Sequence, residues 1–298
     1  MNTGTNREPH PLPLGGARGN AGYRGTVASR AERSMSFGAI AGDYDRLRPD
    51  PPPEAVDWLL PARRDVVVDL AAGTGKLTRA LAGKVRHIVA VEPDDRMRSV
   101  LRSRSGDVEV LPGRGESIPL PDASVDAVFV SSAWHWMDPE LAAPEIARVL
   151  RGGGRFGMLW TGRERDIGWL HENEWFREAR AEREPDTDRA RPPEPEGQAE
   201  RRTPSGAARQ VRLPDSAPFI NIETAVFRFS RYLPVADVVD LLATYSGVIT
   251  ASRRAQEAGK ARAAAALAEQ FPGAAELPVP MASRCWRADR LPRVSSVD

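Results

Sequence analysis

The fold of this chain is decided by residues 66–76, which read Val66-Val67-Val68-Asp69-Leu70-Ala71-Ala72-Gly73-Thr74-Gly75-Lys76. Three β-branched residues in a row favour a strand that is buried on both faces of a parallel sheet. After the turn, Leu77, Ala80 and Leu81 recur at the spacing of a helix, and Gly83 suits its end. This stretch therefore predicts a strand, a glycine turn and a helix. Glycines in such a turn let a ligand approach the backbone, and the helix start offers free N–H groups.

The glycine spacing weighs against a dinucleotide site. The dinucleotide fingerprint is Gly-x-Gly-x-x-Gly, and Thr78 stands where the third glycine would be. An acid, Asp69, precedes the turn. Together these residues resemble motif I of the class I S-adenosylmethionine (SAM) dependent methyltransferases, Asp/Glu-x-Gly-x-Gly-x-Gly, with Ala71 at the first glycine. The resemblance implies that SAM is the cofactor and that the motif contacts it through the following residues: Asp69, Ala71, Gly73, Thr74 and Gly75.

Strand-like and helix-like segments alternate through the chain, which favours a parallel sheet with helices on both faces. Further strands are predicted at 87–92, 108–111, 125–130, 155–160, 219–232 and 277–287. Helices are predicted from near Pro53 to Pro61, after Pro93, after Asp138-Pro139, at 235–242 and at 253–270, and Pro144 is expected to interrupt the third of these. With the resemblance, we expect an α/β, Rossmann-like fold. Its sheet would have seven mostly parallel strands and an antiparallel C-terminal edge strand.

Composition divides the chain into four expected parts. Residues 1–34 are rich in Gly, Pro, Asn, Arg and Ser and predict a disordered N-terminal extension, with Met35 as an alternative start. Residues 35–162 form the expected SAM-binding core. Residues 163–215 predict a variable, flexible insertion, and residues 216–290 are expected to complete the methyltransferase fold.

The charge balance and the cysteine content limit the classes of partner. Lys and Arg number 42 against 41 Asp and Glu, so no overall field favours nucleic acid or an acidic membrane. No apolar run approaches the ~20 residues needed to span a bilayer, and no signal peptide is apparent. The single cysteine, Cys285, excludes an internal disulfide and suits a reducing cytoplasm. We expect a cytoplasmic protein without nucleic acid or membrane partners; the oligomeric state is not readable from the sequence.

The second predicted strand ends at Glu92-Pro93. In the family, an acid at this place accepts hydrogen bonds from both ribose hydroxyls of SAM, which the two oxygens of a carboxylate can do. The resemblance therefore implies cofactor contacts for Glu92 and Pro93. Dinucleotide enzymes use an acid in a similar way, so the discrimination rests on Glu92 in combination with Asp69.

A second family segment follows, and it reads Gly113-Arg114-Gly115-Glu116-Ser117-Ile118-Pro119-Leu120-Pro121-Asp122-Ala123-Ser124-Val125-Asp126. It is similar to Gly-Asp-Ala-Glu-x-Leu-Pro-Phe-x-Asp-x-Ser-Phe-Asp, whose second residue often bonds the adenine amine. Arg114 occupies that place and cannot accept a hydrogen bond. Adenine contacts are then expected from backbone groups near Gly115 and Glu116, or from the Glu116 carboxylate. The alternative is that Arg114 and Glu116 form a solvated loop pair.

The residues after the fourth predicted strand are expected to face the methyl group and the acceptor. Ser131 is assigned to the cofactor, while Trp134, His135, Trp136 and, after the fifth strand, Trp160 are assigned to the substrate pocket. Tryptophan faces attract cations such as a sulfonium. His135 is a candidate general base, with a shaping role as the alternative. The alternative is that one of these tryptophans packs under the next helix, and for Trp160 that it packs against the C-terminal strands.

Two residues ahead of the core complete the expected cofactor site. In related enzymes an aromatic residue here closes over the methionine part of SAM, which Tyr44 could do, and Arg48 could hold its carboxylate bidentately. The alternative is a surface arm. The four histidines are scattered and only one cysteine is present, so no metal site is expected.

Three functions remain open at the level of the sequence. The favoured one is a SAM-dependent methyltransferase that acts on a small-molecule acceptor by direct displacement. The second is a SAM-binding module without turnover that acts through partners. The third, a nicotinamide-dependent oxidoreductase, predicts a glycine at position 78, which is Thr78.

Overall fold

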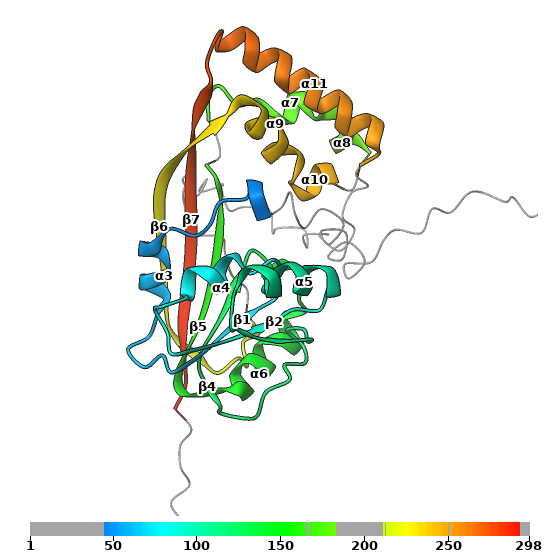
Figure 1. Ribbon diagram of the computed structural model, residues 1–298. Helices are drawn as coiled ribbons and strands as arrows, with labels where there is room; N and C mark the ends of the chain where they lie inside the picture. The colour runs from blue at the N-terminus through cyan, green and yellow to red at the C-terminus, as the bar shows by residue number, and fades with distance from the viewer. Residues whose placement is uncertain (1–44, 165–166, 183–210, 212, 250, 293–298) are drawn as a thin grey trace, which may run out of the picture.

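The computed structural model describes residues 45–164, 167–182, 211, 213–249 and 251–292 (Figure 1). Its described part is built around one seven-stranded sheet of order β3-β2-β1-β4-β5-β7-β6. The strands are β1 (Val66–Leu70), β2 (His87–Val91), β3 (Glu109–Leu111), β4 (Val125–Ser131), β5 (Leu150–Arg163), β6 (Phe219–Pro234) and β7 (Glu276–Arg290). Strands β1 to β5 run parallel to one another, and β7 is antiparallel to both β5 and β6. The expected fold class is confirmed.

Neighbouring residues of β1 face opposite layers of helices, as a strand buried on both faces requires. Val67 packs with Leu59 and Leu77 on one face, and Val68 packs with Ile146 on the other. Helices α3 (Pro53–Leu59) and α4 (Lys76–Leu81) supply the first layer, and α6 (Pro139–Val149) supplies the second. The remaining core helix is α5 (Asp95–Arg104). Its N-cap residue is Asp94, whose side chain accepts hydrogen bonds from the backbone N–H groups of Arg96 and Met97.

The expected break at Pro144 is wrong, because α6 runs through it without interruption. Pro144 cannot donate to the carbonyl of Glu140. Both residues are exposed, so water can reach that carbonyl. The opposite face of the helix buries Ala142, Ala143, Ile146, Ala147 and Val149. Burial of this face outweighs the missing hydrogen bond.

The last strand enters the sheet between two earlier ones. Cys285 of β7 pairs with Leu159 of β5 on one side and with Ala225 of β6 on the other. The β6–β7 hairpin therefore closes the antiparallel end of the sheet, with β6 outermost (Figure 1).

A second group of helices gathers beyond one end of the long strands (Figure 1). It comprises α7 (Glu172–Trp175), α8 (Arg177–Ala181), α9 (Val235–Ala243), α10 (Ser246–Ile249) and α11 (Arg253–Gln270). These helices share a hydrophobic cluster with Leu47, Leu277 and Met281. The beginning of the predicted insertion thus contains α7 and α8, while residues 183–210 and the predicted extension 1–34 lie outside the described residues. The four-part division of the chain stays a prediction.

Candidate functional site

The glycine turn joins β1 to α4 at the carboxyl edge of the sheet. Ala71, Gly73 and Gly75 have φ values of 55°, 58° and 86°, in the left-handed region. A Cβ added to Gly73 would meet nothing within 4 Å, whereas one at Gly75 would lie 2.8 Å from Oγ of Ser105. The turn is therefore open at Gly73, while Gly75 lets α4 pack close to the end of α5.

The carboxylate of Glu92 lies against this open turn. Its Oε2 accepts a hydrogen bond of 2.9 Å from the backbone N–H of Gly73, and its Oε1 accepts one of 3.0 Å from that of Asp94. Burial raises the pKa of Glu92, although these two N–H groups favour the charged form. Each carboxylate oxygen has a second lone pair, so the group can still accept from a ligand.

Asp69 is fully buried beneath the same turn. Its Oδ2 accepts a hydrogen bond of 2.6 Å from Oγ1 of Thr78, and its Oδ1 has no hydrogen-bond partner among the described residues. Burial raises the pKa of Asp69 to about 7, against the effect of the Thr78 hydrogen bonds. Asp69 thus ties the end of β1 to the first turns of α4. The neighbouring Thr74 is buried as well, and Pro93 is exposed beside Glu92.

The loop after β3 makes a tight turn in which Arg114 and Ser117 exchange backbone hydrogen bonds of 3.3 and 3.0 Å. Within it, Gly115 is buried under Met137: a Cβ there would be 2.5 Å from the Met137 sulfur. Oε1 of Glu116 accepts a hydrogen bond of 2.8 Å from the backbone N–H of Asp138. One oxygen of Glu116 therefore anchors the start of α6, and Arg114 is exposed.

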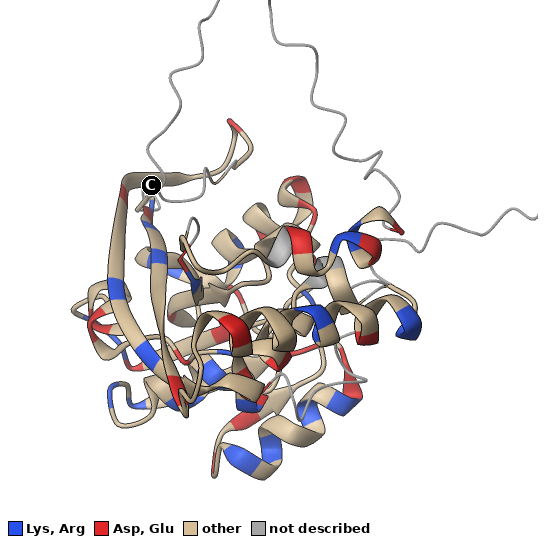
Figure 2. Cartoon of the chain, turned by 90° about the horizontal axis from the view of Figure 1, so that it is seen from above, with Lys and Arg blue, Asp and Glu red and all other residues tan. Residues whose placement is uncertain are grey.

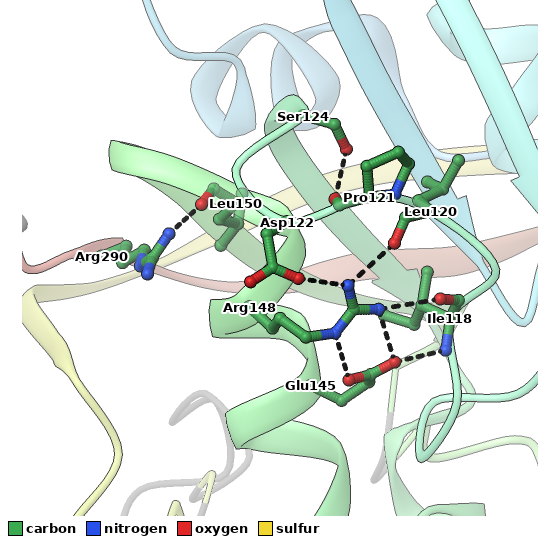
Figure 3. Close-up of polar contacts among 9 residues, drawn as sticks. All are labelled: Ile118, Leu120, Pro121, Asp122, Ser124, Glu145, Arg148, Leu150 and Arg290. Carbon is green, nitrogen blue, oxygen red and sulfur yellow. Dashed lines mark hydrogen bonds and ion pairs between the residues drawn. The ribbon is translucent and has the colours of Figure 1, made fainter.

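Arg148 holds this loop from the side of α6 (Figure 3). Its guanidinium forms an ion pair with Glu145, at 2.7 Å from Nε, and another with Asp122 at 2.8 Å. It also donates to the carbonyls of Ile118 and Leu120 at 3.0 and 2.9 Å. Sequence reasoning missed this residue, because its partners in the loop lie 26 to 30 positions earlier in the chain.

The three aromatic residues after β4, Trp134, His135 and Trp136, differ in burial. Trp134 is buried and meets Phe156 edge to face, with ring centroids 5.5 Å apart. His135 and Trp136 are partly buried, with centroids 4.5 Å apart. Trp134 therefore lies in the core, and His135 and Trp136 are the more accessible pair. The assignment of all three to the substrate pocket stays a prediction.

Two further predicted residues flank this segment at the carboxyl ends of β4 and β5. Ser131 is partly buried and pairs with Leu159 in the sheet, and the next residue, Trp160, is partly buried at the margin of the core.

Arg48 contacts the short segment that joins α9 to α10. Its Nη2 donates a hydrogen bond of 2.9 Å to the carbonyl of Thr244, and its guanidinium stacks 4.0 Å from the centroid of the Tyr245 ring. Its expected contact with the cofactor carboxylate stays a prediction. Tyr44, the other residue of that pair, lies outside the described residues.

Asp45 connects the same segment to the glycine turn, a role that no sequence motif announced. Its carboxylate pairs with Arg79 at 2.7 Å and also with Arg104, and Arg79 donates to the carbonyl of Thr74 at 2.8 Å. Burial alone would raise the pKa of Asp45, but the nearby Thr74 hydroxyl, the hydrogen bond from Arg79 and the charges of Lys76 and Arg79 lower it overall. The segment is thereby fixed beside the turn.

Metal sites and membrane-spanning helices can also be assessed for the described residues. No group of three or more His, Cys, Asp or Glu side chains there is arranged to hold a metal ion. No helix in the same residues is both long and apolar enough to cross a membrane.

Comparison with known proteins gives consistent matches. The family model of a methyltransferase domain matches residues 68–158. An uncharacterized methyltransferase from Mycobacterium tuberculosis is 41% identical over 224 residues, which cover 75% of this chain and 82% of the relative. An uncharacterized methyltransferase from Schizosaccharomyces pombe is 34% identical over 142 residues, 46% of this chain and 57% of the relative. A solved structure, of a candidate type II methyltransferase from Anaeromyxobacter dehalogenans, has the same fold, with a TM-score of 0.58 at 22% identity over 82% of this chain and 99% of that chain.

Proposed function

Because the chain belongs to the class I SAM-dependent methyltransferases, we propose that it transfers a methyl group from SAM to a small-molecule acceptor. The observation that carries this proposal is the position of Glu92, a buried carboxylate held against the open backbone of Gly73. The nicotinamide alternative receives no support from the relatives, which are methyltransferases.

The residues around the turn fit the proposed cofactor. The two ribose hydroxyls of SAM are donors, and Glu92 offers carboxylate oxygens with lone pairs to spare. Gly73 presents no side chain to a ligand that approaches its backbone. Asp69 would support the turn from below, and backbone groups near Gly115 and Glu116, or the Glu116 carboxylate, would contact the adenine.

SAM, when bound, supplies a methyl group on a positively charged sulfur, and this methyl group passes to the acceptor by direct displacement. The protein's part is to position the reactants and to exclude water. Trp136 and Trp160 are proposed to line the acceptor pocket, where aromatic faces would favour a positive charge. His135 is the candidate to take up a proton from the acceptor, and a shaping role is its alternative.

Titration calorimetry with SAM and with NAD tests the cofactor assignment. We expect SAM to bind and NAD not to bind. Binding of NAD without SAM would overturn the proposal.

Turnover is tested separately, because a SAM-binding module without activity is the second candidate function. Its supporting observation is Arg114, which is exposed where the family often has an acid that bonds adenine. The chain is incubated with SAM and a metabolite extract, and mass spectrometry searches for products that gained one methyl group. Such a product supports an enzyme that acts on a small molecule, while SAM binding without any methylated product supports the module.

The aromatic residues at the carboxyl edge favour an apolar or aromatic acceptor. The reducing cytoplasm expected from the composition agrees with the buried, free thiol of Cys285, whose pKa burial raises to about 12. The location in the cytoplasm stays a prediction.

A further inference from the structure

Strand β6 is a long edge strand of the sheet. It spans 16 residues, from Phe219 to Pro234, and lies outside β7 (Figure 1). Within the described part of the chain, no strand pairs with its outer edge. Such an edge presents a row of backbone N–H and C=O groups that can bind another strand.

The side chains of β6 suit a protein partner. Ile222 and Tyr232 are 60% and 68% exposed, and they are the two most exposed large apolar side chains of the described chain. Glu223, Arg228 and Arg231 are the charged residues of the strand. Basic and acidic residues are interspersed over the helices and strands (Figure 2), so attraction between copies would come from local pairs and not from a charged face.

The geometry of a twofold contact limits how two β6 strands can pair. When two copies join their sheets edge to edge into one sheet, the twofold axis that relates them is perpendicular to that sheet. Their β6 strands then run antiparallel, and residues directly opposite one another point to the same face. Because side chains alternate along a strand, the axis must pass beside a residue that lies opposite its own copy.

Only one central residue brings the charges of β6 into favourable pairs. With Phe227 on the axis, Glu223 lies opposite Arg231 within the regular part of the strand, and Tyr232 lies beside the β-bulge of the other copy, which holds Ile222. A centre at Arg228 would place two guanidinium groups opposite each other. A centre at Val226 would place Glu223 opposite Phe229 and bring Arg231 beside the β-bulge, without an acidic partner.

We propose that β6 pairs antiparallel with β6 of a second copy, centred on Phe227, and that the two sheets become one continuous sheet. Each dimer then contains two Glu223–Arg231 pairs across the axis, and each Tyr232 lies near the β-bulge that holds Ile222 of the other copy. In the single chain, Glu223 pairs with Arg287 at 2.8 Å and Arg231 donates to the carbonyl of Leu47 at 2.9 Å. The second Glu223 oxygen and the remaining guanidinium N–H groups can serve the partner copy.

The proposed contact leaves the glycine turn accessible. Strands β4, β5 and β7 separate β1 from β6, which places β1 about 19 Å from the contact at ~4.8 Å for each strand spacing. Dimerisation is therefore expected to be independent of SAM.

Sedimentation velocity of the full chain over a concentration series tests the proposal. We expect a reversible dimer, weakened about tenfold or more by Glu223→Arg and by Arg231→Glu, since each single change places like charges opposite each other. The double variant restores opposite charges and is expected to return the dissociation constant to within about threefold of the original. The matched control is Glu109→Arg, the same change on the opposite edge strand β3, and it should leave the dimer intact.

Hydrogen exchange supplies a second readout that is independent of the charges. Backbone amides of β6 should gain protection as the concentration of the original chain rises, and those of β3 should not. A chain that stays monomeric throughout the series, as it would with its own residues 1–44 on this edge, overturns the proposal. A dimer that ignores both single changes, or that the double change fails to restore, overturns the register and with it the proposal.

Discussion

The hydroxyl of Thr78 donates a hydrogen bond of 2.6 Å to Oδ2 of Asp69, and both residues are buried. Thr78 is the residue that departs from the dinucleotide fingerprint. In this chain it supplies the hydroxyl hydrogen bond to the motif acid, which a glycine could not do. The residue that separates the two cofactor classes in the sequence therefore also maintains the turn in the structure.

The first prediction concerns the stability of the protein as a function of pH. Burial raises the pKa of Asp69 to about 7 in the folded protein, above its ordinary value of 3.8. The folded state therefore holds this proton more tightly. The resulting contribution to stability is complete below about pH 4 and is lost as the pH rises through 7.

Asp69→Asn removes this titration while keeping an acceptor for Thr78. Urea unfolding of both proteins is measured from pH 4 to 8. As the pH rises, the free energy of unfolding of the original protein should fall relative to that of the variant. Groups with lowered pKa values, such as Asp126 and Glu145, act in the opposite direction in both proteins and cancel in the difference. A pH-independent difference would contradict the raised pKa of the buried Asp69.

The two glycines of the turn are predicted to respond differently to alanine. Gly73→Ala adds a Cβ to open space at a φ of 58°, which costs about 1 kcal/mol of stability. Since this Cβ would stand on the face proposed for the cofactor, SAM affinity should fall about tenfold or more. Gly75→Ala combines a φ of 86° with a contact of 2.8 Å to Oγ of Ser105, and should lose about 2 kcal/mol or more.

Chemical unfolding and SAM calorimetry on both variants separate these effects. A Gly73 variant that binds SAM as tightly as the original protein would show that the ligand does not approach this backbone.

Glu92→Gln tests the proposed ribose contact with little change in shape. The new amide keeps one acceptor oxygen but turns an NH₂ group toward a backbone N–H, and it removes the charge that the ribose hydroxyls would meet. The dissociation constant for SAM should rise by about tenfold or more, or about 1.4 kcal/mol. The control is Glu109→Gln on β3, whose side chain is 46% exposed and which should bind SAM normally. Equal affinities for both folded variants would remove Glu92 from the cofactor site.

Arg148 is predicted to govern the order of the loop between β3 and β4. Arg148→Met retains much of the aliphatic stem and loses the contacts with Glu145, Asp122 and two loop carbonyls (Figure 3). The side chain is 32% exposed, so solvent weakens these contacts, and we expect a loss of about 1 to 3 kcal/mol. Hydrogen exchange should speed up at residues 114–122.

Asp122→Asn is the milder comparison, because it alters a single exposed partner of Arg148. It should cost less than about 1 kcal/mol. Unchanged exchange in the Arg148 variant would mean that the loop is held by other contacts.

The sequence predicted the elements whose character is local. The helix at 253–270 has the predicted bounds, because its alanine-rich composition favours a helix on its own. The strand at 66–70 was predicted from its β-branched residues, and Glu92 was placed beside the turn by the family motif. Pro144 misled the prediction because its effect depends on what the other face of the helix buries.

Other features depend on contacts between distant segments. Arg48 and the carbonyl of Thr244 are 196 residues apart, and Asp45 and Arg104 are 59 apart. Nothing in the local pattern around these residues predicts that they meet in the folded chain. Similarly, the spacing of β7 does not show that it enters between β5 and β6.

The order β5-β7-β6 also bears on how the protein is made. A ribosome delivers β5 and β6 before β7, so the two earlier strands emerge with a strand-wide gap between their final positions. The parallel half around β1 can assemble during synthesis, but the gap closes only after residue 290 has left the exit tunnel. Until then β5 and β6 each expose an additional edge to the crowded interior of the cell. A nascent chain stalled before residue 276 would therefore be a natural client for chaperones that shield unpaired strands.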